Sequence, residues 1–378
     1  MRRLALSAAL ALTALGLVPA ARTASLTAPP AVEARAWYVQ HAGTGEVLAS
    51  HAPRARMAIA SITKLMTVLV ALDRLTPTDV VRVDPAAAAV GQERIDLRGG
   101  EEISVGELVA AALIQSANNA AAALALAVAP DFASFAELMN AKARALGLRD
   151  TRFVRPDGLD ASGAYSTARD VTRLARVAMR VPLVRETVGL QTATISGGRT
   201  LRNWNDLLGV VPGVIGVKTG HTDEAGWAQA AAAQGTAGTV YVTILGSPSR
   251  ERRNADLQAL LAWGLAQFRV VEAVRTGRTY AEVSLPYGRG EVALVAPRPL
   301  RLVVRPGRPL VETVVAPVEA SLPVRRGQVL GHVEIRAGER VLGRRPLVAA
   351  REVAAPGLAG RLGWYAERSV HHVVELAR

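Results

Sequence analysis

Residues 61–64 read Ser-Ile-Thr-Lys and stand at the head of an apolar stretch that continues to about Leu75. Apolar side chains recur there at helical spacing, which predicts a helix that opens at Ser61. Three residues apart on a helix, Ser61 and Lys64 lie on one face and can touch. A lysine whose pKa is lowered by burial can act as the base that makes a serine hydroxyl nucleophilic. On its own, however, Ser-x-x-Lys equally fits a helix cap followed by a surface lysine.

Lysine is rare in this chain, and that rarity draws attention to the positions that keep it. Of 45 basic residues only three are lysines, Lys64, Lys142 and Lys218. Arginine does not release its proton in a protein, whereas lysine can. A retained lysine is therefore a candidate for proton transfer or for a compact point charge. Lys142 lies in a predicted amphipathic helix over 132–146 and is most simply a solvated surface charge.

Two more short motifs follow in the sequence. Ser116-Ala117-Asn118 interrupts an apolar helical region over 105–128, and a hydroxyl and a carboxamide at such a break can both face a cleft. Lys218-Thr219-Gly220-His221 reads as part of a strand, on which Lys218 and Gly220 point the same way. The glycine leaves room beside a strand edge where an extended peptide can pair. Taken singly, both motifs also fit ordinary loop and turn sequences.

The composition excludes several classes of function. The chain has no cysteine, which removes disulfides, thiolate nucleophiles and cysteine–metal sites. Its six histidines show no ligand spacing, and no Gly-rich phosphate loop occurs, so we expect neither a metal nor an organic cofactor. The formal net charge of +13 suggests a nucleic-acid partner, but the arginines are scattered and aromatic residues make up only 4%. An anionic envelope polymer or a membrane surface fits the same charge.

The first residues resemble a secretory signal. Arg2 and Arg3 precede an apolar run from Leu4 to Val18, which is short for a membrane span, and small residues follow near Ala20. We therefore expect a signal peptide over 1–20, with an uncleaved anchor as the alternative. In either case most of the chain is exported and works in the cell envelope, in the periplasm or on the outer face of the cytoplasmic membrane.

The rest of the sequence divides into segments that differ in composition and in expected secondary structure. A linker rich in Ala, Pro and Thr covers 21–34, and residues 35–269 mix predicted strands and helices. Short alternating runs separated by Gly and Pro predict a small β-rich domain over 270–352. The tail, 353–378, reads as a helix that either packs on the protein or lies on a membrane as an amphipathic anchor.

Together the three motifs, in this order, resemble the Ser-x-x-Lys, Ser-x-Asn and Lys-Thr-Gly set of penicillin-binding proteins and serine β-lactamases. The resemblance is closest to the D-alanyl-D-alanine carboxypeptidase family, the low-molecular-mass penicillin-binding proteins. It covers about 35–268 and is carried by the segments 57–67, 91–119, 139–147, 156–170 and 216–226. It implies an α/β (α+β) fold, a penicillin-binding-protein/β-lactamase-like transpeptidase domain, with a smaller C-terminal all-β domain.

The resemblance also implies roles for individual residues. It makes Ser61 the acyl-enzyme nucleophile and Lys64 its base, and places Ser116 and Asn118 on the second wall of the cleft. Lys218 with Thr219 and Gly220 would form the cradle for a terminal carboxylate. His221 would contribute its backbone N–H, with that of Ser61, to an oxyanion hole.

Some positions depart from the family pattern. Arg155 stands where an asparagine is usual before proline, and Ala164 replaces a polar residue before Tyr-Ser. Asn203-Trp204-Asn205 carries tryptophan in place of a polar or basic middle residue. We expect acylation to survive these changes and substrate preference to differ.

The expected activity is removal of the terminal D-alanine from peptidoglycan stem peptides, with β-lactam antibiotics as covalent inhibitors. D,D-endopeptidase or transpeptidase activity on the same fold is the nearest alternative. A β-lactamase is less consistent with the sequence, because no Glu-x-x-x-Asn occurs between 150 and 170 and a β domain follows. A non-catalytic envelope protein would have no need of Ser61, Lys64 and Lys218.

Overall fold

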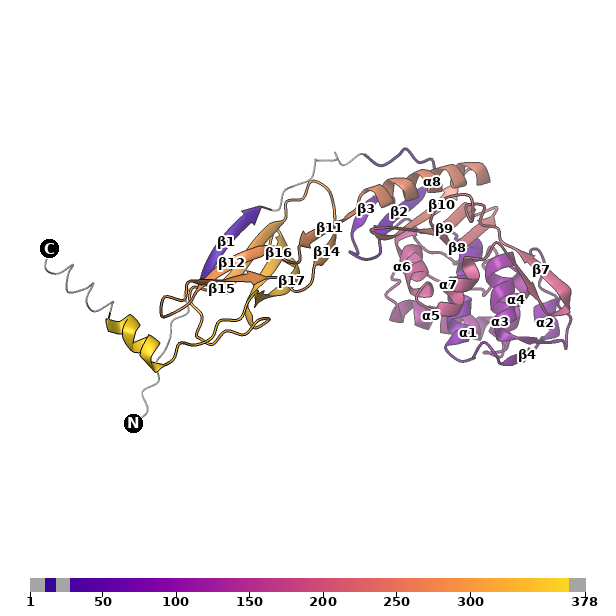
Figure 1. The fold of residues 1–378 in the computed structure, drawn as a ribbon. Coiled ribbons are helices and arrows are strands. Elements are labelled where there is room, and N and C mark those ends of the chain that lie inside the picture. Colours follow the sequence, from indigo (N-terminus) through magenta and orange to yellow (C-terminus); the bar gives the residue numbers. More distant parts are fainter. Residues whose placement is uncertain (1–10, 18–27, 367–378) are drawn as a thin grey trace. The chain divides into compact units, whose positions relative to one another are not determined.

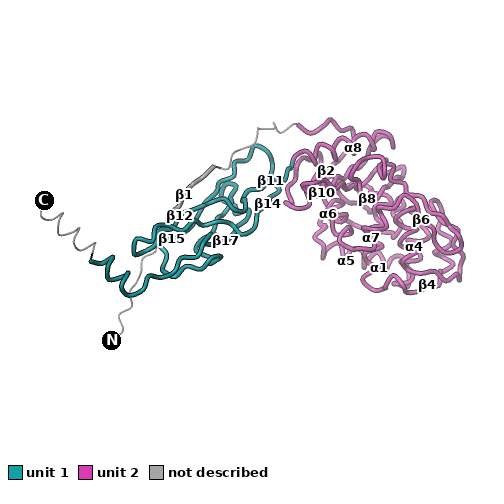
Figure 2. The backbone as a smooth tube through the Cα atoms, viewed as in Figure 1, with its two compact units in different colours: residues 1–26, 268–378 teal, residues 27–267 magenta. Residues whose placement is uncertain are grey.

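The structure, a computed structural model, describes residues 11–17 and 28–366 of the chain. It divides into two compact units, residues 27–267 and residues 268–378 with 1–26 (Figure 2). Several predicted segments fall partly outside the described residues. These are residues 1–10 and 18–20 of the signal segment, 21–27 of the linker and 367–378 of the tail helix.

The larger unit is built on a five-stranded antiparallel sheet with the strand order β3-β2-β10-β9-β8 (Figure 1). Its strands are β2 (Ala36–His41), β3 (Val47–His51), β8 (Val214–Thr222), β9 (Gly226–Gly235) and β10 (Gly238–Ser247). The strand predicted around Lys218 is thereby confirmed, and the strand-like runs of the sequence near Trp37, Val47, Ala228 and Thr239 form the other strands of this sheet. β8, which carries the Lys-Thr-Gly motif, pairs only with β9 among these strands, so its other side is a sheet edge.

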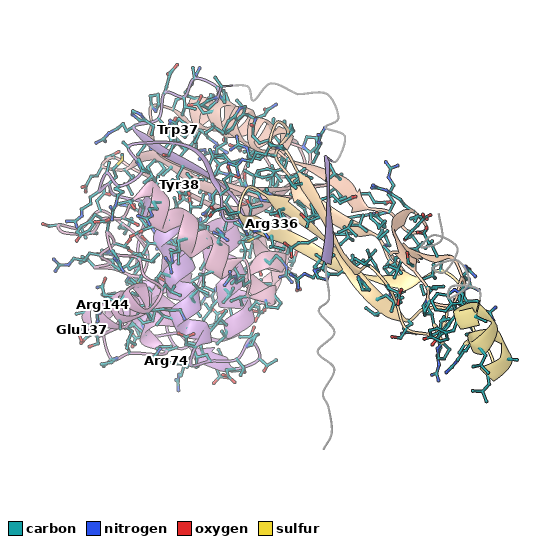
Figure 3. All side chains as sticks on the ribbon, turned by 90° about the vertical axis from the view of Figure 1, so that its left-hand side faces the viewer. Trp37, Tyr38, Arg74, Glu137, Arg144 and Arg336 are labelled. Atoms are coloured by element: carbon teal, nitrogen blue, oxygen red, sulfur yellow. The ribbon has the colours of Figure 1, made fainter. Side chains whose placement is uncertain are left out.

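Side chains on the two faces of this sheet enter different cores, as the two-residue period of a strand requires. Trp37 packs in the core under α8 (Arg250–Ala266), whereas its neighbour Tyr38 belongs to the large helical core on the opposite face (Figure 3). On β10, Val240 and Val242 likewise face α8 while Tyr241 faces the helices. Both faces are therefore covered.

The large core on the opposite face is mostly helical. Its centre is α1 (Lys64–Leu72), which is buried along its whole length up to Ala71. The other helices of this part are α2 (Pro85–Ala88), α3 (Val105–Ala110), α4 (Asn118–Leu126), α5 (Phe132–Ala145), α6 (Ala168–Ala178) and α7 (Pro182–Val188). Two small two-stranded sheets accompany them, β4 (Val80–Arg82) with β5 (Glu102–Ser104) and β6 (Thr192–Ile195) with β7 (Arg199–Arg202), and η3 (Ser196–Gly198) joins β6 to β7.

Three predicted helices differ in detail. The turn that contains Ser61 is a 3-10 helix, η1 (Ala60–Thr63), and the α-helix begins only at Lys64. The helical region 105–128 is interrupted as expected, since a π-helical turn, η2 (Ala111–Gln115), leads to Ser116 in the left-handed conformation (φ 62°). The apolar spacing of Leu257, Leu260 and Leu261 predicts a helix over 254–268, but α8 begins earlier, at Arg250. The Ser249 side chain accepts a hydrogen bond from the Arg252 N–H and caps it.

The smaller unit consists of β-strands over 269–349, as predicted, followed by the tail helix. A six-stranded sheet has the order β1-β15-β16-β17-β13-β12, and β11 pairs with β14. The strands are β1 (Ala11–Leu17), β11 (Arg269–Val274), β12 (Thr279–Ser284), β13 (Glu291–Val295), β14 (Leu300–Val304), β15 (Val311–Pro317), β16 (Val329–Ala337) and β17 (Arg340–Ala349). Residues 11–17, part of the predicted signal segment, form β1 and pair antiparallel with β15. Cleavage near Ala20 stays a prediction.

The tail is helical over 358–366, which is the described part of the predicted helix. Leu358, Leu362 and Tyr365 on this helix are 80%, 69% and 56% exposed. No helix among residues 11–17 and 28–366 combines the length and the apolar composition that a membrane crossing needs.

Candidate active site

Ser61 and Lys64 are in contact, as their spacing predicts. Lys64 Nζ lies 2.7 Å from Ser61 Oγ, within hydrogen-bond distance. Two more acceptors surround the same nitrogen, Asn118 Oδ1 at 2.7 Å and the Asp157 carbonyl at 2.6 Å. A neutral lysine keeps two N–H donors and one lone pair. It can therefore hold Asn118 and Asp157 while its lone pair faces the Ser61 hydroxyl.

The environment of Lys64 favours this neutral form. Its side chain is 0% exposed, and burial lowers the pKa of Lys64 to about 7 against the opposing pull of Asp157 and Glu93. An amine with this pKa is substantially unprotonated near neutral pH, which is the condition for a general base. Arginine has no such neutral form in proteins. This explains why position 64 has a lysine in a chain that otherwise uses arginine.

Asp157, which holds Lys64 through its backbone carbonyl, was not identified from the sequence as part of the site. Its buried carboxylate accepts hydrogen bonds from Arg155 Nε at 3.0 Å and Nη2 at 2.8 Å, and from the Leu159 N–H at 3.0 Å. Burial raises the pKa of Asp157, but the hydrogen bonds from Arg155 and Leu159 outweigh it and hold the pKa below its usual value. Arg155, noted as a departure from the family pattern, thus fixes the backbone whose carbonyl holds Lys64.

Ser116 and Asn118 lie opposite Ser61, where the break between η2 and α4 places them. Both side chains are buried. Asn118 reaches Lys64 with Oδ1 and the Gly91 carbonyl with Nδ2 at 3.2 Å, while its backbone N–H bonds the Glu93 carbonyl at 2.6 Å. One carboxamide therefore joins the base to the segment that carries Glu93. The structure brings both predicted residues into the site.

Lys218 on β8 completes the group of predicted polar residues. Its nitrogen lies 2.9 Å from Ser116 Oγ and 3.1 Å from the Thr219 carbonyl, and its side chain is 2% exposed. Burial lowers the pKa of Lys218 well below its usual value, and the charges of Lys64 and Arg253 lower it further. Lys218 and Ser116 thus form a second amine–hydroxyl pair beside the first.

Gly220 lies where β8 passes the nucleophile. A Cβ atom at Gly220 would stand 2.8 Å from the Ile59 carbonyl oxygen and 3.2 Å from the Ser61 nitrogen, so only glycine fits without displacing that segment. His221 follows with an exposed side chain that stacks on Trp227, with ring centroids 4.0 Å apart. The donation of the Ser61 and His221 N–H groups to an oxyanion stays a prediction.

The cleft also contains residues that the sequence did not single out. Beside Ser61, Ser116 and the strand β8, its walls are formed by Glu93, Trp204, Trp227, Arg250 and Arg253. Trp204 donates from Nε1 to the Gln115 carbonyl at 3.0 Å, and the Arg250 guanidinium lies 5.4 Å from its ring centroid. The tryptophan that departs from the family pattern therefore forms one wall of the site.

Arg253 is the cation placed deepest in this wall. Its side chain is 1% exposed, and burial lowers the pKa of Arg253 to about 10. Asp206 lies 3.2 Å from Arg253 Nη2 and 2.8 Å from Arg250 Nε, so one carboxylate serves two guanidinium groups. An uncompensated positive charge remains beside Lys218. No local pattern predicted this, because Arg253 reaches the cleft only through the packing of α8 on the sheet.

Lys142, the third lysine, lies away from these groups. Its nitrogen lies 2.6 Å from Asp73 Oδ1 in a surface ion pair. In the part of the chain that the structure describes, no group of three or more His, Cys, Asp or Glu side chains is arranged to hold a metal ion.

Both units match known families. The family described as D-alanyl-D-alanine carboxypeptidase matches residues 23–249, and the family described as penicillin-binding protein 5, C-terminal domain, matches residues 268–355.

Among individual relatives, D-alanyl-D-alanine carboxypeptidase DacF of Bacillus subtilis is 28% identical over 88% of each chain. Carboxypeptidase DacC of Escherichia coli is 31% identical over 88% of this chain and 87% of that protein. A D-alanyl-D-alanine endopeptidase of Pseudomonas aeruginosa is 36% identical, but over 58% of this chain and 73% of that protein.

Solved structures of related proteins share the fold. Penicillin binding protein 6B from Escherichia coli superposes with a TM-score of 0.65 at 27% identity, over 87% of this chain and 99% of that one. The Streptomyces K15 DD-transpeptidase superposes with a TM-score of 0.60 at 31% identity, over 64% of this chain and all of the other. With the family match extending over more than half of its length, this chain belongs to the D-alanyl-D-alanine carboxypeptidase family of serine hydrolases.

Proposed function

We propose that the chain removes the terminal D-alanine from peptidoglycan stem peptides through an acyl-enzyme on Ser61. The observation that carries the proposal is the contact of Ser61 Oγ with a fully buried lysine whose pKa is about 7. Neutral Lys64 takes the Ser61 proton as Oγ attacks the carbonyl carbon between the two D-alanines. The negative charge that develops on the carbonyl oxygen is stabilised by the N–H groups of Ser61 and His221.

Collapse of this intermediate breaks the C–N bond and leaves the acyl group on Ser61. The proton that Lys64 took from Ser61 passes through Ser116, which is hydrogen-bonded to Lys218, to the leaving amine of D-alanine, so Lys64 is neutral again. A water molecule then attacks the acyl carbonyl carbon and gives its proton to Lys64. Lys64 returns a proton to Ser61 Oγ as the shortened stem peptide departs, so the enzyme ends as it began.

The preference for a terminal D-alanine follows from charge. A stem peptide that ends at the scissile D-alanine presents a free carboxylate to Lys218, Thr219 and Arg253, whereas a cross-linked stem presents an amide. Arg253 is almost fully buried, and losing one partner of a buried, hydrogen-bonded charge pair costs about 2–5 kcal/mol, more than losing an exposed pair. Carboxypeptidase activity is therefore proposed over endopeptidase activity, with β-lactams as covalent inhibitors.

The test compares two substrates under the same conditions. We expect faster release of D-alanine from a stem peptide ending in D-Ala-D-Ala than cleavage of a cross-linked stem dimer, by at least about tenfold in kcat/KM, which corresponds to about 1.4 kcal/mol. Ser61→Ala should release nothing from either. Faster cleavage of the dimer would instead identify an endopeptidase, and net transfer to an added amine would identify a transpeptidase.

Two further proposals concern location. The substrate lies outside the cytoplasmic membrane, and the signal segment 1–20 would deliver the chain there; N-terminal sequencing of the mature protein tests this.

In the tail, Leu358, Leu362 and Tyr365 recur at i, i+4 and i+7 and are exposed, as on a helix that lies on a membrane surface. Binding of the full chain to lipid vesicles, measured in the experiment described below, tests the second proposal.

A further inference from the structure

A second polar cavity lies on the larger unit, away from the cleft. It is lined by side chains of α5, including Glu137, Asn140 and Arg144, and by Arg149, Thr151 and Arg152 from the loop that follows. Glu137 and Arg144 lie next to each other on this surface (Figure 3). We refer to this cavity as the arginine groove.

The arginine groove carries an excess of positive charge. Among the described residues, the side chains of Arg144, Arg149 and Arg152 have no carboxylate partner within hydrogen-bond or ion-pair distance, and Glu137 is the one acidic residue in the lining. Because these guanidinium groups are exposed and unpaired, they can bind an anion without first breaking an ion pair.

The margin of the groove adds more positive charge. Arg54 and Arg56 share the carboxylate of Asp150, at 3.4 Å and 3.0 Å, and remain 62% and 55% exposed. Arg56 also lies 4.7 Å from the ring centroid of Tyr165, which lines the groove. Two arginines paired with one carboxylate leave a net positive margin.

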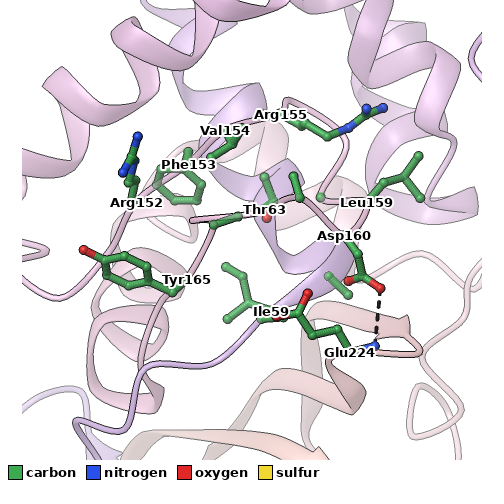
Figure 4. Close-up of a pocket in the computed structure, with 15 residues that line it drawn as sticks. Ile59, Thr63, Arg152, Phe153, Val154, Arg155, Leu159, Asp160, Tyr165 and Glu224 are labelled. Atoms are coloured by element: carbon green, nitrogen blue, oxygen red, sulfur yellow. Dashed lines mark hydrogen bonds between the residues drawn. The ribbon is translucent and has the colours of Figure 1, made fainter.

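The groove adjoins the segment that carries the nucleophile. Arg152 and Tyr165 line both the groove and a smaller cavity (Figure 4). The other walls of that cavity include Ala60 and Thr63, the first and last residues of the turn η1 that carries Ser61. The backbones of Arg152 and Tyr165 are joined by two hydrogen bonds of 2.8 Å and 3.0 Å, which hold this common wall in place. A polymer bound in the groove therefore lies close to the catalytic segment.

The positive charge of the arginine groove and its position beside the catalytic segment together indicate which ligand binds there. Peptidoglycan carries stem peptides with free carboxylates at regular intervals, and a stem keeps a terminal carboxylate when its last D-alanine is removed. A polymer held by one stem in the groove would keep a neighbouring stem near Ser61. Resting on the proposed function, the structure assigns the arginine groove as a secondary binding site for carboxylate-bearing stem peptides of polymeric peptidoglycan.

The test compares polymeric and short substrates in the full-length protein. Changing Arg144, Arg149 and Arg152 together to Gln should lower kcat/KM for isolated peptidoglycan sacculi at low salt by at least about fivefold, since charge steering raises encounter rates by tenfold or more. Release of D-alanine from a short soluble stem peptide, and the rate of labelling by fluorescent penicillin, should stay unchanged. The deficit should shrink as salt is raised.

A matched variant tests whether the effect depends on where the positive charge is removed or only on the total charge of the protein. Arg82, Arg98 and Arg180 are exposed arginines outside the groove, and their joint change to Gln removes the same charge. This control should cleave sacculi like the unmodified protein. Equal losses in both triple variants, or no loss in either, would overturn the assignment.

A third measurement distinguishes another polyanion. Binding of the groove variant to vesicles containing phosphatidylglycerol should match that of the unmodified protein. If the groove variant loses vesicle binding but retains activity on sacculi, the groove serves a membrane surface and the assignment is wrong. If the unmodified protein releases no D-alanine from the short stem peptide either, it is the proposed function that fails.

Discussion

Replacing Lys64 with arginine is expected to lower the rate of acylation of Ser61 by penicillin by about 10²- to 10⁴-fold, the usual contribution of a general base. Arginine keeps the positive charge and can still donate to Asn118 and Asp157, but it has no lone pair for the Ser61 proton. The rate of labelling with a fluorescent penicillin measures the effect.

Two controls make this result specific. Lys142→Arg changes the surface lysine that pairs with Asp73 and should leave the labelling rate unchanged. Lys64→Met tests whether the bulk of arginine is responsible, and it should be equally slow while retaining the melting temperature. For the unmodified protein, the labelling rate should rise as pH increases through about 7, because the neutral fraction of Lys64 grows over that range. Rapid labelling of Lys64→Arg would show that no deprotonation at this residue is needed.

Replacing Arg253 with methionine is expected to remove most of the preference for a free terminal carboxylate. Loss of one partner from a buried charge pair costs about 2–5 kcal/mol, which corresponds to at least about 30-fold in kcat/KM for a stem peptide that ends in a carboxylate. The same stem peptide with a C-terminal carboxamide should lose little, since it has no charge for Arg253 to bind. Measuring both substrates with both proteins gives the discrimination ratio.

The neighbouring arginine on α8 provides the matched control. Arg252 pairs with Asp256 at 3.0 Å and is not among the residues that line the cleft. Arg252→Met should therefore keep the discrimination ratio of the unmodified protein. Equal losses on the carboxylate and carboxamide substrates in Arg253→Met would mean that Arg253 supports the structure of the cleft and does not read the carboxylate.

Much of the site follows from the sequence because the three motifs mark positions that the fold must bring together. Ser61 and Lys64 are close by helical spacing, and their contact is local. The contact of Lys218 with Ser116 spans 102 residues and could be expected only from the resemblance. The strand alternation in 270–349 likewise predicted the all-β unit, because each strand buries one face.

The remaining parts of the site depend on packing that no local pattern encodes. The backbone carbonyl of Asp157 accepts a hydrogen bond from Lys64, although the two residues are 93 positions apart in the sequence. The identity of residue 157 does not predict a contact made by its backbone. Arg253 lies in the first turn of α8 and is buried in the cleft wall, and no sequence pattern singled it out. The signal that could have helped was Ser249, a good N-cap that places the start of α8 at Arg250.

Residues 11–17 illustrate a different limit. Their apolar character indicates a secretory segment, and the same character suits a strand at the edge of a sheet, which is where β1 lies. Composition alone does not separate the two. The same limit applies to Trp204. The sequence marks this residue as a departure from the family pattern, but only the structure shows that it lines the cleft.

The central claim is that Ser61 is the residue that becomes acylated. Mass spectrometry of the full-length protein after incubation with benzylpenicillin, followed by peptide mapping, tests this most directly. We predict one penicilloyl group per chain, located on Ser61, slow to hydrolyse, and absent from Ser61→Ala. An adduct on another residue, or persistent labelling of Ser61→Ala, would contradict the account.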